Sequence, residues 1–384
     1  MTAHSSSGYG RARLWLGVTA VGTIVVLSAA ALLMGVPERL ATLTDRTASP
    51  GAFALLLFFG LYALLHLPFD LMGGYVLPRR FGRTHPPLPR FLLKLLRGAL
   101  AHLAVLMLFA FAFLLAAQQL GMIGIIGAGV LATFGLLVVR PNLAGLFAQQ
   151  RVTDESPAPV LIGDRSLPAT GIESEDEGFT GGFVGVIRPR RIILPGHWSS
   201  ILGPSGLDLV RQRRASAVQL GTWRRGRLLA LAFTWVGIIV AALLVGSDDL
   251  ATAAGIIKFS LLFTLWSFLG LLILPTPSRA GVAEVDACVR ASLPDDDELM
   301  AVVRRLDALQ DGEPRRPRGV EMIFHPVPSV DSRSSLPARR GAARGFLDAA
   351  RTSIFLSAAG LGLLGRAVHC NCGRPALWVF LPSD

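Results

Sequence analysis

The sequence predicts a mainly α-helical, polytopic membrane protein with about six spans and a small α+β domain outside the bilayer. Of its 384 residues, 52% are hydrophobic and only 16% are charged, against about 25% charged in an average soluble domain. The mean hydropathy is +0.54. A soluble fold could not cover this much apolar surface, so part of the chain must be in contact with lipid.

Six stretches are long and apolar enough to cross a membrane, since a bilayer core of about 30 Å requires about 20 apolar residues in a helix. They are residues 14–36, 52–77, 92–117, 121–139, 228–246 and 252–275. The first four define an N-terminal membrane region, residues 1–139, and the last two a transmembrane hairpin, residues 228–275. The first stretch is too long for a cleaved signal peptide, and no small-residue cleavage site follows it.

Basic residues are distributed unevenly between these spans. Arg residues concentrate in the N-terminal tail and in residues 78–91, 140–227 and 276–384, whereas the links at 118–120 and 247–249 contain no basic residue. The positive-inside rule therefore predicts that both termini are cytoplasmic, in what we expect to be a bacterial inner membrane. The net charge of +11 is explained by topology, so we expect membrane lipid and no nucleic acid as a partner.

A seventh apolar stretch, residues 352–368, is interrupted by glycines. We expect an interfacial or packed helix there rather than another span. Four ionisable residues lie within or near the spans. We expect Asp70 and Lys258 to extend to the membrane surface, and His66 and His102 to hydrogen-bond to neighbouring helices.

The two extramembrane regions contain recognisable elements. In the loop 140–227, the composition predicts a flexible segment at 150–180. A hairpin formed by 183–187 and 191–194 and a helix at 206–221 should follow. The region 276–384 should begin with a helix containing Glu284 and Asp286, and a second helix is expected at 296–310, after an acidic run.

The order of these pieces resembles the integral-membrane zinc metallopeptidases that include the CAAX-prenyl endopeptidases and the HtpX heat-shock protease. The resemblance covers about residues 180–335. Its parts are the hairpin at 181–194, the helix 206–221, the spans 228–275, the segment 278–290, and His325-Pro326 followed by Arg333. The resemblance implies that 140–227 and 276–384 form one metallopeptidase-like domain on the cytoplasmic side.

The zinc-binding residues of that family are missing. The family binds zinc with two His of an H-E-x-x-H helix and a third ligand, and the Glu activates water. The matching positions here are Arg213, Arg214 and Ala217, with Val282 at the third-ligand position. Asp286, His325, Pro326 and Arg333 match retained family positions. We therefore predict no catalytic residue and no zinc site of the family type.

A different metal site is conceivable at the end of the chain. His369, Cys370 and Cys372 form a weak candidate group, which Cys288 or His325 could complete. C-x-C alone is a weak signal for zinc, so no cofactor is expected, although zinc is left open. The small number of cysteines indicates a reducing compartment and no disulfide framework.

The leading hypothesis is a pseudoprotease: a membrane peptidase scaffold without catalysis that binds other membrane proteins or peptides. One alternative is an active membrane metallopeptidase with a relocated metal site, which would use the Cys/His group or His325 and Glu284. A transporter and a membrane assembly module are further alternatives. The oligomeric state is not predicted.

Overall fold

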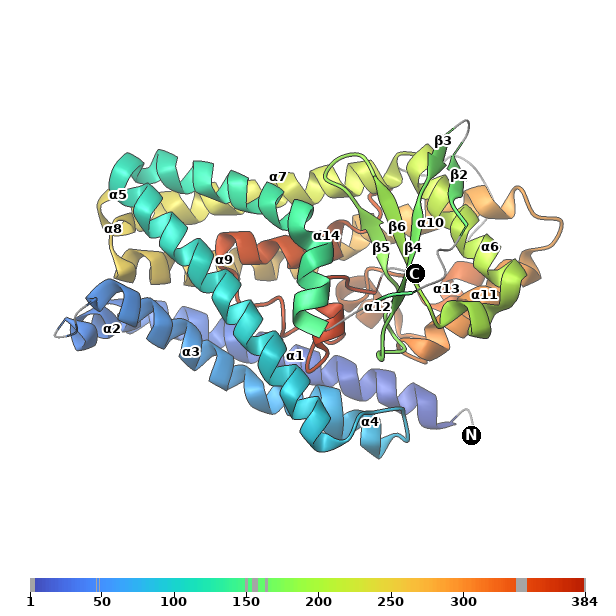
Figure 1. Cartoon of the computed structure of the whole chain (residues 1–384), viewed down its shortest axis with the longest axis horizontal. Coiled ribbons are helices and arrows are strands. Elements are labelled where there is room, and N and C mark those ends of the chain that lie inside the picture. Colours follow the sequence, from blue (N-terminus) through green and yellow to red (C-terminus); the bar gives the residue numbers. More distant parts are fainter. Residues whose placement is uncertain are drawn as a thin grey trace.

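The computed structural model describes residues 4–45, 47, 49–148, 151–153, 158–162, 165–335 and 344–382. Long helices form a bundle at one end of the molecule, and a small α+β domain lies at the other (Figure 1). Five helices are long and apolar enough to cross a membrane. They are α1 (His4–Leu33), α3 (Pro50–Leu71), α5 (Leu88–Ala148), α7 (Thr222–Val245) and α9 (Ala253–Ile273).

Helix α5 consists of two antiparallel arms. Its 61 residues are interrupted at Gly121, where φ is 58° and ψ is −140°. A straight helix of that length would measure about 90 Å, three times a bilayer core. Instead the chain turns back at Gly121, and the two arms diverge in a V toward the other end of the bundle (Figure 1). Close to the turn the arms touch, since a Cβ atom at Gly124 would overlap the carbonyl of Ala116. With α5 counted twice, the five helices give six crossing segments, which confirms the predicted count of about six.

The connections alternate between the two ends of the bundle. The short helices α2 (Val36–Thr44) and α8 (Ser247–Leu250) lie at one end with the turn of α5. The N-terminus, α4 (Leu77–Arg80) and the α+β domain lie at the other end (Figure 1). The Arg-rich segments therefore share one side, which is the arrangement that the charge pattern predicted.

A four-stranded sheet organises the extramembrane domain. Its strands are β1 (Arg151–Val152), β4 (Ala169–Glu173), β6 (Arg191–Pro195) and β5 (Gly182–Val184), in the order β1-β4-β6-β5. Strands β5 and β6 form the predicted antiparallel hairpin, and β4 pairs with β6 in parallel. Strands β2 (Val160–Ile162) and β3 (Arg165–Leu167) form a separate ribbon.

The described part of 150–180 differs from the flexible segment that we expected, because it contributes strands β1 to β4. Ala169 and Ile172 of β4 are buried, and β4 pairs with a strand some twenty residues further along the chain. Composition indicated flexibility because it reports only local polarity. It does not register a pairing with a distant strand.

Helices from both halves of the chain pack together in this domain. Helix α6 (Trp198–Gln219) includes the predicted helix at 206–221 and is kinked at Gly203, where φ is 70°. It packs against α10 (Pro275–Arg290) and α11 (Asp296–Leu309). The shorter α12 (Arg318–Phe324) and α13 (Val330–Ser334) follow. Loop 140–227 and residues 276–335 thus pack into one domain, whereas the described residues 349–382 of the predicted region 276–384 pack with the spans instead.

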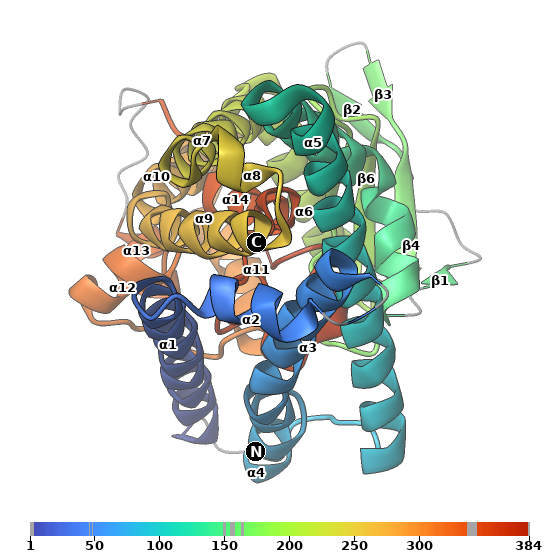
Figure 2. The ribbon, with the colours of Figure 1, turned by 90° about the vertical axis from the view of Figure 1, so that its left-hand side faces the viewer.

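The C-terminal part of the chain turns back into the helix bundle. Helix α14 (Ala349–Leu356) and the 3₁₀ turns η2 (Ser357–Gly360) and η3 (Pro375–Leu377) belong to it. Figure 2 shows α14 inside the surrounding long helices. We refer to residues 349–382 as the inner segment.

The inner segment is packed against the spans. Leu361, Leu364 and Ala367 belong to the same buried cluster as side chains of α3, α5 and α9. Ser260 of α9 donates a hydrogen bond of 2.6 Å to the carbonyl of Leu361. Residues 352–368 are therefore packed, one of the two expected states, but they do not form a single helix, because α14 ends at Leu356 and Leu361 has a φ of 60°.

We expected Asp70 and Lys258 to extend to the membrane surface and the histidines of the spans to hydrogen-bond to neighbouring helices. Only part of this is observed. Lys258 lies near a helix end, within 2.8 Å of Asp249 and 2.7 Å of Glu38. Asp70 does not reach the surface, since it is fully buried and paired with Arg366 of the inner segment. Both ring nitrogens of His66 are buried without a hydrogen-bond partner among the described residues, contrary to the expected hydrogen bonds between helices.

Candidate functional site

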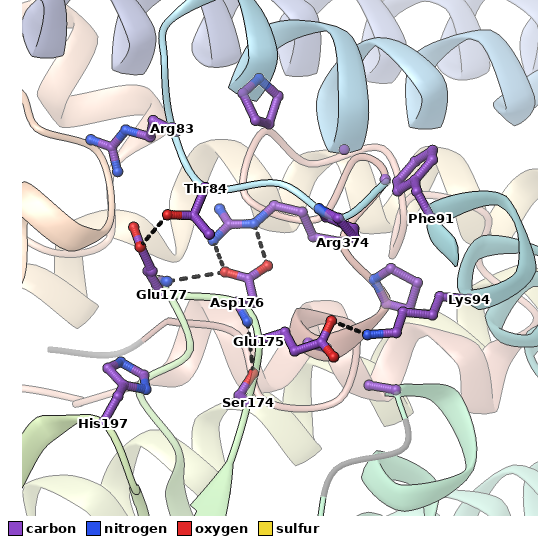
Figure 3. A pocket seen from close by; sticks show the side chains of 18 of the residues that line it. Arg83, Thr84, Phe91, Lys94, Ser174, Glu175, Asp176, Glu177, His197 and Arg374 are labelled. Carbon is purple, nitrogen blue, oxygen red and sulfur yellow. Dashed lines mark hydrogen bonds and ion pairs between the residues drawn. The ribbon is translucent and has the colours of Figure 1, made fainter. Parts of the chain in front are cut away.

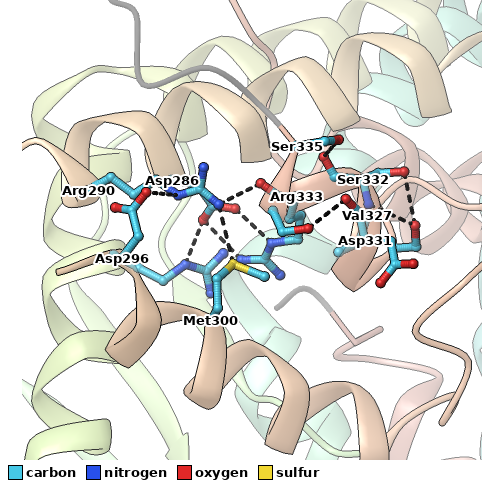
Figure 4. A network of polar contacts seen from close by, with 12 residues as sticks. Asp286, Arg290, Asp296, Met300, Val327, Asp331, Ser332, Arg333 and Ser335 are labelled. Atoms are coloured by element: carbon cyan, nitrogen blue, oxygen red, sulfur yellow. Dashed lines mark hydrogen bonds and ion pairs between the residues drawn. The ribbon is translucent and has the colours of Figure 1, made fainter.

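Helices α6 and α10 face each other where the resemblance places a metal, and an ion-pair network joins them (Figure 4). Arg213 of α6 donates from Nε to Asp286 Oδ1 of α10 at 3.0 Å. Arg333 of α13 donates from Nε to Oδ2 at 2.7 Å and from Nη2 to Oδ1 at 2.9 Å. All three side chains are buried, so one carboxylate is shared by two guanidinium groups in the interior of the domain.

The charge of Asp286 is maintained by its partners. Burial alone would raise the pKa of the Asp286 carboxyl, but the Arg333 and Arg213 guanidinium groups more than offset it and hold the pKa below its usual value. The carboxylate is therefore ionised at neutral pH. Breaking this network would leave an unpaired charge in the interior, which is costly.

The other three positions of the lost motif have structural roles. Arg214 donates hydrogen bonds of 2.6 Å to the carbonyls of Ile193 and Thr180, which attaches α6 to the sheet. Its guanidinium also lies 5.4 Å from the centre of the Trp198 ring. Ala217 and Val282 are 0% and 1% exposed and fill the core between the helices.

These residues do not fit the zinc ion that the fold implies. Zinc requires nitrogen, sulfur or oxygen atoms with free lone pairs, whereas guanidinium groups only donate. The network around Asp286 already carries two cations for one carboxylate. Nearby Glu284 binds Arg225 at 2.8 Å and the backbone amide of Gly345 at 2.7 Å. No catalytic step can be derived through a metal at this position.

A second cluster lies between the extramembrane domain and the inner segment, beside a cavity that Arg333 also lines. One ligand atom each of Asp311, His325 and His369 lies within 4.8 Å of the others. The sequence suggested His369 and His325 as metal ligands, and the structure brings their rings to a centroid distance of 5.1 Å. Asp311 was missed because nothing in the sequence around it distinguishes it from the other acidic residues that follow α11.

The two thiols of the proposed C-x-C group do not join this cluster among the residues that the structure describes. Cys372 is fully buried and donates to the carbonyl of Ala367 at 3.2 Å. Cys288 lies near a different cavity, beside α6. Burial lowers the pKa of His369 to about 4 and lowers that of His325 well below its usual value, so both imidazoles are neutral at pH 7.

A pocket of about 780 Å³ lies between the bundle and the extramembrane domain. It is lined by the start of α5, the loop before it, the loop between β4 and β5, and part of the inner segment. Charges of both signs meet there (Figure 3): Arg374 pairs with Asp176, Lys94 pairs with Glu175, and Thr84 donates to Glu177 at 2.8 Å. It is larger than the pocket of about 580 Å³ beside α6 and the cavity of about 20 Å³ next to His325.

Two comparisons with known proteins agree with this architecture. Residues 1–144 match the family model of the CAAX prenyl protease N-terminal region, described as five membrane helices. The fold is that of Ste24p from S. mikatae, with a TM-score of 0.69 and 13% sequence identity. The alignment covers 87% of this chain and 88% of that one. No curated protein matches the sequence.

The chain is therefore a multi-pass membrane protein whose N-terminal region matches the CAAX prenyl protease N-terminal family model and whose fold is similar to that of Ste24p. This confirms the resemblance that the sequence predicted, and it extends the predicted coverage to the N-terminal spans.

Proposed function

We propose that this protein is an integral-membrane pseudoprotease, which retains the peptidase scaffold, lacks catalysis and acts by binding other membrane proteins or peptides. The observation that carries the proposal is the Arg213–Asp286–Arg333 network. Arg213 of this network stands at a position that the sequence resemblance assigns to a zinc ligand, and Arg333 and Asp286 surround it with a second cation and a counter-ion. A peptide bound there would meet no activated water and no Lewis acid.

The inner segment supports the same proposal. It fills the space between the spans with buried side chains such as Leu361 and Phe380. This packing favours a binding protein with a solid interior over a transporter. The hypothesis of a relocated metal site built on Glu284 has no support either, because both carboxylate oxygens of Glu284 accept hydrogen bonds from Arg225.

The pocket of about 780 Å³ is the proposed binding site. Its side chains offer both positive and negative groups, which suits an extended polypeptide better than a purely anionic ligand such as phosphate. The loop between β4 and β5 forms one wall, and α5, which crosses the bilayer, forms another. A segment leaving the membrane could therefore enter it directly.

We further propose that the α+β domain and the N-terminus face the cytoplasm of a bacterial inner membrane. The Arg-rich segments lie together at the domain end of the bundle. Arg on that side would also contact anionic lipid headgroups.

Loss of catalysis is tested with the purified full-length protein in detergent. Supplied with zinc, it is incubated with β-casein and with a quenched fluorogenic peptide. We expect no cleavage beyond that of a mock preparation from cells without the gene. Cleavage that copurifies with the protein and stops on adding a chelator would refute the proposal.

Binding at the pocket is tested by photo-crosslinking in cells. A photoreactive amino acid replaces Ala148, which lines the pocket, and the matched control carries it at Leu108, which is 64% exposed on the surface of α5. We expect adducts of discrete mass only at position 148, and their loss when Glu175→Lys changes the charge of the pocket. Adducts that are absent at 148, equal at both positions, or insensitive to Glu175→Lys would count against a peptide-binding pocket.

A further inference from the structure

The cluster of Asp311, His325 and His369 joins three separate parts of the fold. Asp311 follows α11, His325 follows α12, and His369 belongs to the inner segment. The ligand atoms of these residues lie farther apart than atoms that are hydrogen-bonded to each other. Nδ1 of His325 lies 3.8 Å from Oδ2 of Asp311, which is too long for a hydrogen bond.

The same spacing suits shared coordination. Two ligands that each lie about 2.1 Å from one zinc ion are separated by roughly 3.4 Å in tetrahedral geometry and by up to about 4.2 Å when they stand opposite each other. The 3.8 Å distance falls within this range. All three ligand atoms lie within 4.8 Å of one another, and a separation of 4.8 Å would have to shorten by about 0.6 Å for both atoms to bind one ion.

The ring nitrogen of His325 that lacks a partner is Nε2 and not Nδ1, so a ligand that satisfied it would be bound through Nε2. His325 is only 4% exposed, and its Nε2 atom has no hydrogen-bond partner among the described residues. Buried polar atoms are nearly always paired. A cavity of about 20 Å³ adjoins His325 and Asp311, which is room for about one water-sized occupant.

The surroundings hold the three residues in place. Arg13 of α1 donates to the carbonyl of His369 at 2.6 Å. Arg316 donates to Asp311 Oδ2 at 2.9 Å and lies 3.3 Å from Asp307, so its charge is shared between two carboxylates. Arg333 and Arg351 also line the cavity. Because these cations repel a metal ion, the ion would have to coordinate Asp311 directly and compete there with Arg316.

We propose that Asp311, His325 and His369 form a binding site for a zinc-type divalent ion. Two imidazoles and a carboxylate are a ligand set that zinc accepts, with a fourth position left for water. Because the ligands come from the α+β domain and from the inner segment, the ion would fasten the inner segment to the domain. None of its three ligands belongs to the Arg213–Asp286–Arg333 network, although Arg333 lines the adjoining cavity. The proposal does not depend on the proposed loss of catalysis.

The test uses full-length protein in detergent, with any affinity tag removed, and Co²⁺ as a spectroscopic probe. We expect one Co²⁺ per chain, with visible absorption bands typical of low coordination number, and displacement by an equivalent of Zn²⁺. His325→Ala, His369→Ala and Asp311→Asn should each weaken binding at least tenfold. The double variant Cys370→Ser/Cys372→Ser and the single variant His197→Ala are matched controls and should bind like the wild type.

Zn²⁺ should also raise the unfolding temperature of the wild type, reversibly on adding EDTA, and should not do so in His369→Ala. Wild-type protein that binds no Co²⁺ at micromolar concentrations overturns the proposal, whether or not the variants fold. So does binding that survives in all three ligand variants, or that is lost only in the cysteine variant. Cleavage activity in the metal-loaded protein would refute the pseudoprotease proposal and leave the metal site standing.

Discussion

The role of Asp286 depends on the residues that surround it. In the sequence it matches a retained family position, and in the structure its carboxylate binds both Arg213 and Arg333. Its side chain and theirs are almost completely buried. We therefore expect the network to contribute to the stability of the domain and not to catalysis. Substitutions can test this role.

Asp286→Asn should destabilise the domain by about 3 kcal/mol or more, because two buried guanidinium groups lose their counter-ion. The control Asp208→Asn removes a carboxylate from the same helix as Arg213. Asp208 is 69% exposed in its pair with Arg211, so that substitution should cost no more than about 1 kcal/mol. Thermal unfolding in detergent measures both. Similar losses in the two variants would contradict the assigned role.

A triple variant tests whether apolar side chains of similar volume can replace the buried charges of the network without loss of stability. Arg213→Met, Asp286→Leu and Arg333→Met together remove every charge of the network and retain apolar volume. Such replacements of buried ion pairs are often neutral or stabilising. We expect an unfolding temperature much closer to the wild type than that of Asp286→Asn. A triple variant that is less stable than the single one would show that these arginines have further essential partners.

The pH dependence of this network follows from the lowered pKa of Asp286. A carboxyl with a lowered pKa in the folded state stabilises the fold fully above its usual value of 3.8, and this contribution is lost as the pH falls through the folded-state pKa. The gap in unfolding temperature between wild type and Asp286→Asn should be constant between about pH 7 and pH 5 and shrink below about pH 4. A gap that closes near neutral pH would be inconsistent with the network.

Between elements, backbones pack closely where the inner segment crosses the π-helix η1 (Met72–Val76), which follows α3. A Cβ atom at Gly74 would overlap the carbonyl oxygen of Gly373, and one at Gly73 would overlap that of Cys372. These two backbones can approach only because both positions lack side chains. The glycines of η1 thus determine whether the inner segment can enter the bundle.

Gly74→Ala should therefore loosen the inner segment, at a cost of about 1–3 kcal/mol for overpacking. The control is Gly60→Ala in α3, where a Cβ atom meets nothing within 4 Å and helix propensity favours Ala. Limited proteolysis followed by mass mapping should find new cleavage within 349–382 in Gly74→Ala alone. Unchanged protection of this segment would argue against the close packing.

At the scale of the whole molecule, the six crossing segments place Asp248 and Arg188 on opposite sides of the membrane. Asp248 is exposed in the link between α7 and α9, and Arg188 is exposed in the turn between β5 and β6. With the native cysteines changed to Ser, Asp248→Cys in intact cells should react with a membrane-impermeant maleimide. Arg188→Cys should react only after permeabilisation. The reverse pattern would invert the proposed orientation.

Much of this architecture could be predicted because the signals are local. Each span is an apolar run that indicates burial in lipid by itself, and the β5–β6 hairpin lies between Gly and Pro residues. Elements that depend on distant partners were predicted less well. Strands β1 to β4 were expected to be flexible, and the inner segment was expected to form a helix, although its conformation follows from packing against α3, α5 and α9.

The sequence by itself determined three features of this protein. It is embedded in a membrane, its basic regions are grouped between particular spans, and it contains no H-E-x-x-H motif. These are properties of residue types and short spacings, since transfer to lipid sums over neighbouring residues. Only the tertiary structure decided what replaces the motif, what fills the helix bundle, and that Asp311 meets His325 and His369. Ion pairs and ligand clusters require side chains from distant segments to lie within a few ångströms, and that depends on how the whole chain packs.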